Sequence, residues 1–264
     1  MPEKEGEKKE EVDLVRRRTL KALVTLAGAA MIISAVPPII EEIIPPVSGL
    51  TSFPTLKLLD PSGNPIKASS IPPNTSYLYV FNYPLSNEPN MLINIGDQQG
   101  NPVNVPPTTV TVPQTGATYD FPGGVGPNNS IVAYSGICQH LGCQTPLISF
   151  YPPNIPSCQP AQTSAGSLKG VIHCLCHGST YDPAKGGAVV TGPTVRPLPY
   201  VSLKYDPSTD ELYAEKMVGP VIYGHPGFGN PTDSVVNNPM GDLQGGSPVT
   251  QAVVNNLGKL SQCG

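Results

Sequence analysis

The sequence predicts an all-β protein built around an antiparallel β-sandwich, and three observations support this fold class. The chain of 264 residues contains 33 Pro and 27 Gly, so a long helical period cannot persist through most of it. Short β-branched and aromatic runs recur along the chain. Turn residues separate these runs at intervals that are typical of a sandwich.

Each predicted strand rests on one such run. The runs lie at residues 56–59, 77–83, 91–95, 108–112, 130–135, 201–205 and 211–215. The last two flank the sequence Asp-Pro-Ser-Thr-Asp at 206–210, which predicts a hairpin.

The charge pattern excludes one class of partner and indicates another. The net charge is −4, and no basic surface for nucleic acid is expected. Seven of the 15 basic residues lie within positions 1–21, and an uncharged, apolar stretch follows at 22–40. That stretch is just long enough to cross a bilayer, and the basic flank predicts a cytoplasmic N-terminus. A buried core helix is the alternative, but the stretch is apolar all round rather than along one stripe.

The basic flank has a second interpretation. The run Arg16-Arg17-Arg18-Thr19-Leu20 before the apolar stretch resembles a twin-arginine export signal, with Thr19 where Phe is usual. No Ala-x-Ala cleavage site clearly follows, so an uncleaved single-pass anchor is expected. The rest of the chain would then lie on the outer face of the membrane.

These features divide the chain into segments. We expect a cytoplasmic segment at 1–21, a transmembrane anchor at 22–40, a tether at 41–52, a β base domain at 53–135 and 199–222, a small inserted β subdomain at 136–198, and a C-terminal extension at 223–264.

The residues that carry chemistry lie in two short strings of the inserted subdomain. The first is Cys-Gln-His-Leu-Gly-Cys at 138–143, and the second is Cys-Leu-Cys-His-Gly-Ser at 174–179. A [2Fe–2S] cluster in which two imidazoles replace two thiolates on one iron needs two Cys and two His, one of each from each string. A structural zinc site and a purely disulfide-linked scaffold are the alternatives. The first lacks its usual symmetric Cys-x-x-Cys pairs, and the second leaves both histidines unused.

The two strings resemble the two boxes of the Rieske iron–sulfur proteins of cytochrome bc complexes, with Leu175 where Pro is commonest. The resemblance implies the Rieske fold and one [2Fe–2S] cluster. It also implies four ligands: Cys138 and Cys174 on one iron, and His140 and His177 on the other. The remaining two cysteines of the boxes, Cys143 and Cys176, would form a disulfide.

The same resemblance implies roles for further residues near the cluster. The hydroxyls of Ser179 and Tyr181 would donate hydrogen bonds to the cluster and a ligand thiolate and so raise the reduction potential. Gly192 and Pro193 would cover the cluster, and Leu141 would be an apolar shield at the tip.

Two histidines and two cysteines lie outside these sets. His173 and His225 are expected to be structural or solvated, since the pattern does not use them. Cys158 and Cys263 are an even remainder, which predicts a second disulfide in an oxidising compartment.

Rieske proteins include a quinol-oxidising class and an oxygenase-type class. The hydroxyls of Ser179 and Tyr181, the Cys143–Cys176 pair and the predicted anchor favour the quinol-oxidising class. The implied role is a high-potential electron-transfer subunit of a respiratory oxidoreductase complex. It would take an electron and a proton from membrane quinol at His140 or His177, beside a cytochrome b-type subunit, and reduce a cytochrome or copper acceptor. The anchor, long insertion and tail are similar to archaeal Rieske proteins of the SoxF type. A Rieske small subunit of a molybdenum enzyme such as arsenite oxidase, or a stand-alone Rieske protein, is the alternative.

Overall fold

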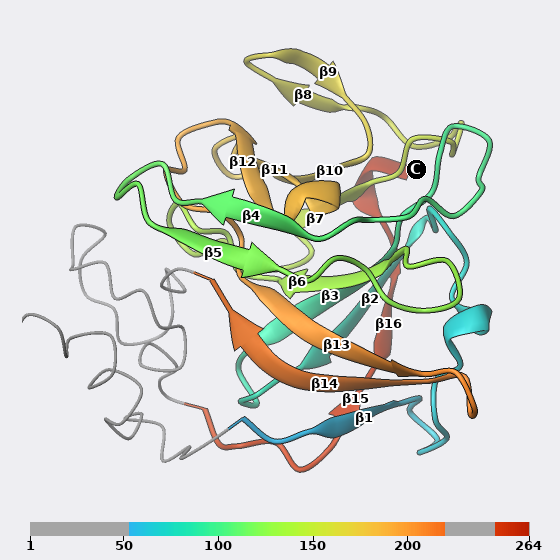
Figure 1. The fold of residues 1–264 in the computed structure, drawn as a ribbon. Helices are drawn as coiled ribbons and strands as arrows, with labels where there is room; N and C mark the ends of the chain where they lie inside the picture. Colours follow the sequence, from blue (N-terminus) through green and yellow to red (C-terminus); the bar gives the residue numbers. More distant parts are fainter. Residues whose placement is uncertain (1–52, 220–245, 264) are drawn as a thin grey trace, which may run out of the picture. The chain divides into compact units, whose positions relative to one another are not determined.

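The computed structural model describes residues 53–219 and 246–263, and within them the predicted all-β class is confirmed. Their regular structure consists of β-strands and three short 3-10 helices (Figure 1). None of the helices in this described part is long and apolar enough to span a bilayer. The expected anchor at 22–40 and its flanks, together with His225, lie outside the described residues.

The strands of the described part follow one another at short intervals. In chain order they are β1 (Leu56–Leu59), β2 (Tyr77–Asn82), β3 (Pro89–Asn94), β4 (Thr108–Thr111), β5 (Thr118–Phe121), β6 (Ile131–Ser135), β7 (Ile148–Tyr151), β8 (Ala161–Thr163), β9 (Gly166–Leu168), β10 (Val171–Cys174), β11 (Thr180–Asp182), β12 (Ala188–Thr191), β13 (Tyr200–Asp206), β14 (Glu211–Val218), β15 (Ala252–Val253) and β16 (Asn255–Lys259). The 3-10 helices are η1 (Ala68–Ser70), η2 (Pro183–Lys185) and η3 (Ser261–Cys263).

The larger sheet has eight strands in the order β15-β1-β14-β13-β6-β3-β2-β16 among the described residues. Its longest hairpin joins β13 to β14, with Asp206 opposite Glu211. The turn between them is the predicted one, where Asp206 accepts hydrogen bonds from the backbone N–H and the hydroxyl of Ser208.

The C-terminal segment closes this sheet. Strand β15 pairs in parallel with β1, and β16, which begins two residues later, pairs with β2 at the other end of the strand order. The sequence did not predict these strands, because β16 reads Asn-Asn-Leu-Gly-Lys and has no apolar alternation. Backbone pairing to β2, rather than side-chain burial, makes it a strand.

Both faces of the larger sheet are buried. Along β3, Met91 and Ile93 point into one apolar cluster and Leu92 into the other. The second cluster unites residues of strands at both ends of the order, Leu58 on β1 and Phe81 on β2, as expected inside a sheet closed on itself. Since alternate residues face opposite sides of a strand, burial on both sides explains the continuous apolar runs.

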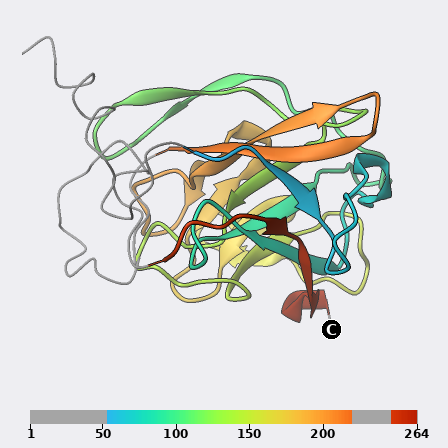
Figure 2. The ribbon, with the colours of Figure 1, turned by 90° about the horizontal axis from the view of Figure 1, so that it is seen from below.

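The first cluster lies between the larger sheet and a second sheet. This second sheet has the order β12-β11-β10-β7, and all four of its strands fall within the predicted insert at 136–198. Phe121, at the end of the β4–β5 hairpin (Figure 1), packs edge-on against Tyr200 of β13, with ring centroids 5.0 Å apart. The view from below in Figure 2 shows the C-terminal strands, in dark red, running along the sheet towards η3.

Candidate metal centre

Two loops of the insert carry the cysteine and histidine strings. The same pattern of two backbone hydrogen bonds closes each loop. In the first loop, Cys138 N–H donates to the carbonyl of Cys143, and Gly142 N–H donates to the carbonyl of Cys138. In the second, Cys174 N–H donates to Ser179, and Gly178 N–H donates back to Cys174. Each string therefore folds into one tight turn that begins at its first cysteine.

The glycine at the fifth position of each string makes this turn possible. Gly142 has a φ of 77° and Gly178 a φ of 83°, in the left-handed region that other residues rarely adopt. Each string thus contains the glycine that its turn requires, which is why the pattern can be recognised from the sequence.

The first cysteines of the two strings lie together in the core. Cys138 and Cys174 are buried in the same apolar cluster, and neither is part of a disulfide. The hydrogen bond from Cys174, reinforced by one from Tyr181, lowers the pKa of the Cys138 thiol to about 6 despite burial. The core below the two loops thus holds two free thiols, and the lowered pKa of one of them favours its thiolate form, which binds metals.

The two histidines of the strings also meet. The rings of His140 and His177 pack edge to face with centroids 4.9 Å apart. His140 Nδ1 is buried without a hydrogen-bond partner in the described part of the chain. A buried, unpaired imidazole nitrogen is costly, and coordination of a metal would satisfy it.

Ser179 is the second unsatisfied group here. Its hydroxyl lies near enough to the Cys138 thiol to help lower the pKa of that thiol. Among the described residues, the buried Ser179 Oγ has no regular hydrogen-bond partner. The two loops therefore supply two free thiols, two imidazoles and a buried, unpaired Ser179 hydroxyl, and this donor set fits a [2Fe–2S] cluster.

The other sulfurs do not compete for a metal. Cys143 and Cys176 form a disulfide, with Cα atoms 6.6 Å apart, that links the two loops. Their sulfurs lie within 4.8 Å of the Cys174 thiol. Because the disulfide removes both from coordination, this group of three sulfurs is no zinc site.

The second expected disulfide is also present in the structure. Cys158, in the long segment between the strings, is bonded to Cys263 in η3. Next to it, the side chain of Gln262 donates to the carbonyl of Phe150 in β7, 2.7 Å away. The disulfide and this hydrogen bond therefore attach the C-terminal segment to the sheet that carries the second loop.

Tyr181 is fully buried on β11, immediately after the second string. Its hydroxyl lies 3.3 Å from Cys138 Sγ and accepts a hydrogen bond of 3.0 Å from the backbone N–H of Gln139. Burial and the nearby Cys138 raise the pKa of this phenol well above its usual value. Tyr181 therefore stays protonated and has a proton to donate.

A third segment covers the second loop. Gly192 packs so closely that a Cβ on it would lie 2.5 Å from the carbonyl oxygen of Gly178 and 2.6 Å from the Cα of Ser179. The next residues, Pro193 and Thr194, continue this segment, and Thr194 is buried. The resemblance of Gly192-Pro193-Thr194 to a covering segment marks all three positions.

The two loops also present exposed apolar side chains. Leu141 is 47% exposed and Leu175 is 51% exposed, one from each loop. Leu147 joins them, since its carbonyl accepts the N–H of Leu175 and its side chain is 49% exposed. These three leucines form what we call the tip patch, of which the sequence predicted only Leu141.

His173 is structural, as expected. It is buried in β10, where its Nδ1 lies 2.8 Å from the Thr180 hydroxyl and its ring packs edge-on against Tyr151. These two contacts hold the His173 ring within the sheet.

Comparisons with known proteins agree with this geometry. The Rieske [2Fe-2S] domain family matches residues 97–202. Two relatives are the cytochrome bc1 complex Rieske iron-sulfur subunits of Streptomyces lividans and Streptomyces coelicolor, each 34% identical over 102 residues, or 36% of this chain. The match spans 48% of the first relative and 23% of the second.

One solved structure is also similar. The soluble domain of the Rieske protein II from Sulfolobus acidocaldarius is 29% identical, with a TM-score of 0.44 over 74% of this chain and 96% of that one. The family match covers both loops and the third segment, where the thiols, imidazoles and unsatisfied polar atoms meet. Residues 97–202 therefore match a Rieske [2Fe–2S] domain, and over 102 residues the chain is similar to the Rieske subunits of two cytochrome bc1 complexes.

Proposed function

We propose that this protein is a high-potential Rieske subunit that takes an electron and a proton from membrane quinol and passes the electron to a cytochrome or copper acceptor. The observation that carries the proposal is the contact between the rings of His140, which is partly exposed, and His177, which is exposed, in loops that also present the exposed side chains of Leu141 and Leu175. A quinol ring is apolar with polar hydroxyls, so it matches an exposed imidazole in loops that also carry exposed leucines.

The proposed ligands are Cys138 and Cys174 on one iron and His140 and His177 on the other. The cluster, when bound, supplies a one-electron acceptor whose histidine ligands raise its potential. His140 would hold the metal through its buried, unpaired Nδ1, and Nε2 on the opposite edge of the ring would then be the atom that accepts a proton.

The neighbouring hydroxyls favour a high potential. Tyr181 remains protonated and lies 3.3 Å from Cys138 Sγ, and the buried Ser179 hydroxyl lies beside the same site. Donors aimed at a cluster stabilise its more negative, reduced state. This pair of donors supports the quinol-oxidising class over low-potential Rieske proteins.

The proposed location is the outer face of a cell membrane, with residues 22–40 as the anchor and residues 41–52 as the tether. Two disulfides support an oxidising compartment. The related proteins are subunits of cytochrome bc1 complexes, which supports a cytochrome b-type subunit as the partner of the tip patch.

The test is reduction by quinol of the full-length protein purified with its membrane partners. Adding quinol should reduce the Rieske centre, and inhibitors of the quinol-oxidising site of cytochrome b should block the reaction. Co-purification with a molybdopterin subunit and without b-type haem would instead support the molybdenum-enzyme alternative.

A surface variant sharpens this test. Leu141→Gln should slow reduction by quinol about tenfold, because it removes roughly 1.4 kcal/mol of apolar contact at the tip patch. It should leave the reduction potential unchanged. The matched control is Leu257→Gln on β16, where Leu257 is 54% exposed and belongs to the larger sheet. Equal rates for the two variants would argue against docking at the tip patch.

A further inference from the structure

The third segment extends over residues 192–197 and is fixed at both of its ends. On one side, Thr191 belongs to β12, which pairs with β11. On the other side, the N–H of Leu198 donates to the carbonyl of Gly187 at 2.9 Å. Between these points, Gly192 lies against the backbone of the second loop. The third segment is therefore held at its two ends and rests on the second loop.

The turn of the β4–β5 hairpin, at residues 112–117, holds the third segment from a distant part of the chain. The backbone N–H of Gln114 donates to the carbonyl of Val195 at 3.1 Å. The side-chain Oε1 of Gln114 accepts a hydrogen bond of 2.7 Å from Nε of Arg196. One residue thus makes two hydrogen bonds to successive residues of the third segment.

The hairpin that presents Gln114 is itself well fixed. Within its turn, the N–H of Gly116 donates to the carbonyl of Val112 at 2.9 Å. At its base, the hydroxyl of Tyr200 in β13 donates to the carbonyl of Asp120 at 2.7 Å. Gln114 is therefore attached to the larger sheet, whereas the residues that it binds follow the strands of the second sheet.

The two side chains of this contact differ in exposure. Arg196 is only 3% exposed, so its guanidinium is largely removed from water, and a hydrogen bond from a charged group is stronger than one between neutral groups. Gln114 is exposed. Its side chain can therefore leave Arg196 without opening the core, which a buried partner could not do.

We propose that Gln114 is a positioning residue that latches the third segment over the second loop and so limits how often the proposed cluster meets solvent. When the latch is broken, the third segment opens more often, and local opening of a covering segment exposes the groups beneath it. The inference rests on the proposed [2Fe–2S] cluster but not on quinol as the electron donor.

The experiment follows loss of the cluster from the purified full-length protein in excess EDTA by the decay of visible circular dichroism. Gln114→Met keeps the length of the side chain and removes the acceptor, so the cluster should be lost about tenfold faster. Gln114→Glu keeps an oxygen that can accept from Arg196 and should restore the wild-type rate. The matched control is Gln162→Met at an exposed glutamine of β8, which bonds to Pro160 and Ser167 within its own hairpin and should keep the wild-type rate.

Amide hydrogen exchange of the same variants measures the opening directly. Peptides that cover residues 192–197 should exchange faster in Gln114→Met, whereas peptides that cover β1 to β3 should exchange as in the wild type. A wild-type rate of cluster loss in Gln114→Met, or equal acceleration in Gln114→Glu or Gln162→Met, would overturn the inference. So would faster exchange spread over both sheets, since Gln114 would then support the whole fold.

The failure of the proposed function can be told apart from the failure of the latch. If quinol does not reduce the protein, the rates of cluster loss and exchange are still measurable and decide the role of Gln114. If the purified protein carries no [2Fe–2S] cluster, the proposed function fails and the latch inference fails with it.

Discussion

The carbonyl oxygen of Gly178 lies 2.5 Å from the position that a Cβ on Gly192 would occupy. The third segment therefore rests directly on the backbone of the second loop, at a φ of 101° for Gly192. No side chain larger than hydrogen fits there without movement of one of the two segments, and those segments flank the proposed cluster.

Gly192→Ala should consequently destabilise the domain and loosen the cluster. Overpacking against the backbone costs about 1–3 kcal/mol, in addition to about 1 kcal/mol for the positive φ. Urea unfolding and the rate of cluster loss would measure both effects. Gly166→Ala is the matched control, since Gly166 has a φ of 99° and a Cβ on it would meet no other atom within 4 Å. Equal losses in the two variants would show that only the backbone conformation matters at Gly192.

Ser179→Ala should lower the reduction potential while the cluster stays bound. The buried Ser179 hydroxyl lies beside the Cys138 thiol and has no regular hydrogen bond among the described residues, so a cluster atom is the donor's expected partner. Redox titration with visible circular dichroism gives both readings. Ser149→Ala, at a buried serine of β7 whose hydroxyl contacts Gln262, should leave the potential unchanged. An unchanged value in Ser179→Ala would remove this residue from the tuning of the cluster.

Replacing both Cys158 and Cys263 by Ala should lower the free energy of unfolding by about 4 kcal/mol, because their disulfide closes a long loop of the unfolded chain. The two residues are 105 positions apart. The cluster spectrum should persist, since Cys143 and Cys176 still link the loops. Guanidinium unfolding would measure the change.

The control for the disulfide is Gln262→Leu, which removes the adjacent hydrogen bond to Phe150 and leaves the disulfide in place. Its cost should be only about 1 kcal/mol. If the double Ala variant costs no more than this control, the C-terminal segment is held by its strand pairing alone.

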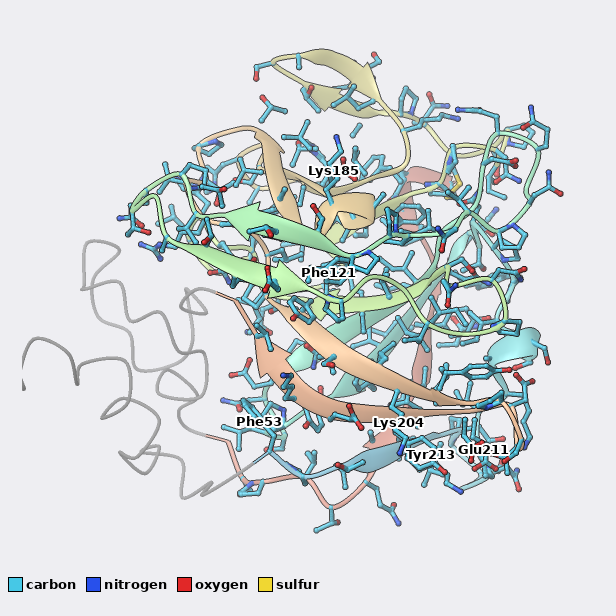
Figure 3. The ribbon with its side chains drawn as sticks, viewed as in Figure 1. Phe53, Phe121, Lys185, Lys204, Glu211 and Tyr213 are labelled. Carbon is cyan, nitrogen blue, oxygen red and sulfur yellow. A yellow bond between two sulfur atoms is a disulfide. The ribbon has the colours of Figure 1, made fainter. Side chains whose placement is uncertain are left out.

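Stability in acid should depend on Glu211. Hydrogen bonds from Lys57 at 2.7 Å and from Lys67 at 3.2 Å lower the pKa of its carboxyl to about 2 (Figure 3 labels Glu211 beside Tyr213). Because the folded-state pKa is below the unfolded value, the stabilisation is fully present above about pH 4.5 and is lost as the pH falls towards 2. Unfolding measured across this window should therefore show stability decreasing with acidity.

Glu211→Gln should flatten the pH dependence in that window. Lys57→Met should weaken it in the wild-type chain and have no further effect on it in the Glu211→Gln chain, because the ion pair is already absent. A Glu211→Gln chain with the same pH dependence as the wild type would assign the acid sensitivity to other carboxylates.

Cys138→Ser should abolish cluster binding without unfolding the sheets. The larger sheet has its own apolar cluster, including Leu58, Phe81 and Leu92, which contains none of the proposed ligands. Far-ultraviolet circular dichroism should remain that of a β protein while the visible spectrum disappears. Loss of both signals together would mean that the cluster is needed for folding.

Much of the fold could be predicted because its strands carry local signals. The β13–β14 hairpin has apolar runs on either side of an Asp-Pro-Ser-Thr-Asp turn, and the structure places the hairpin there. Strand β16 could not be predicted, since its residues are polar and its partner β2 lies far away in the sequence. The sheet is closed by backbone hydrogen bonds, which leave no pattern in the side chains.

The candidate site also has one part that the sequence predicts and another that only the folded structure shows. The two loops could be predicted from the amino-acid order alone, because each contains its own glycine for the tight turn and its own sulfur and imidazole groups. Two features of their surroundings could be seen only in the folded chain: the exposed leucines of the tip patch and the contact of Gly192 with the second loop. These relations join segments that are distant in the chain, so they depend on packing between elements and on no local motif.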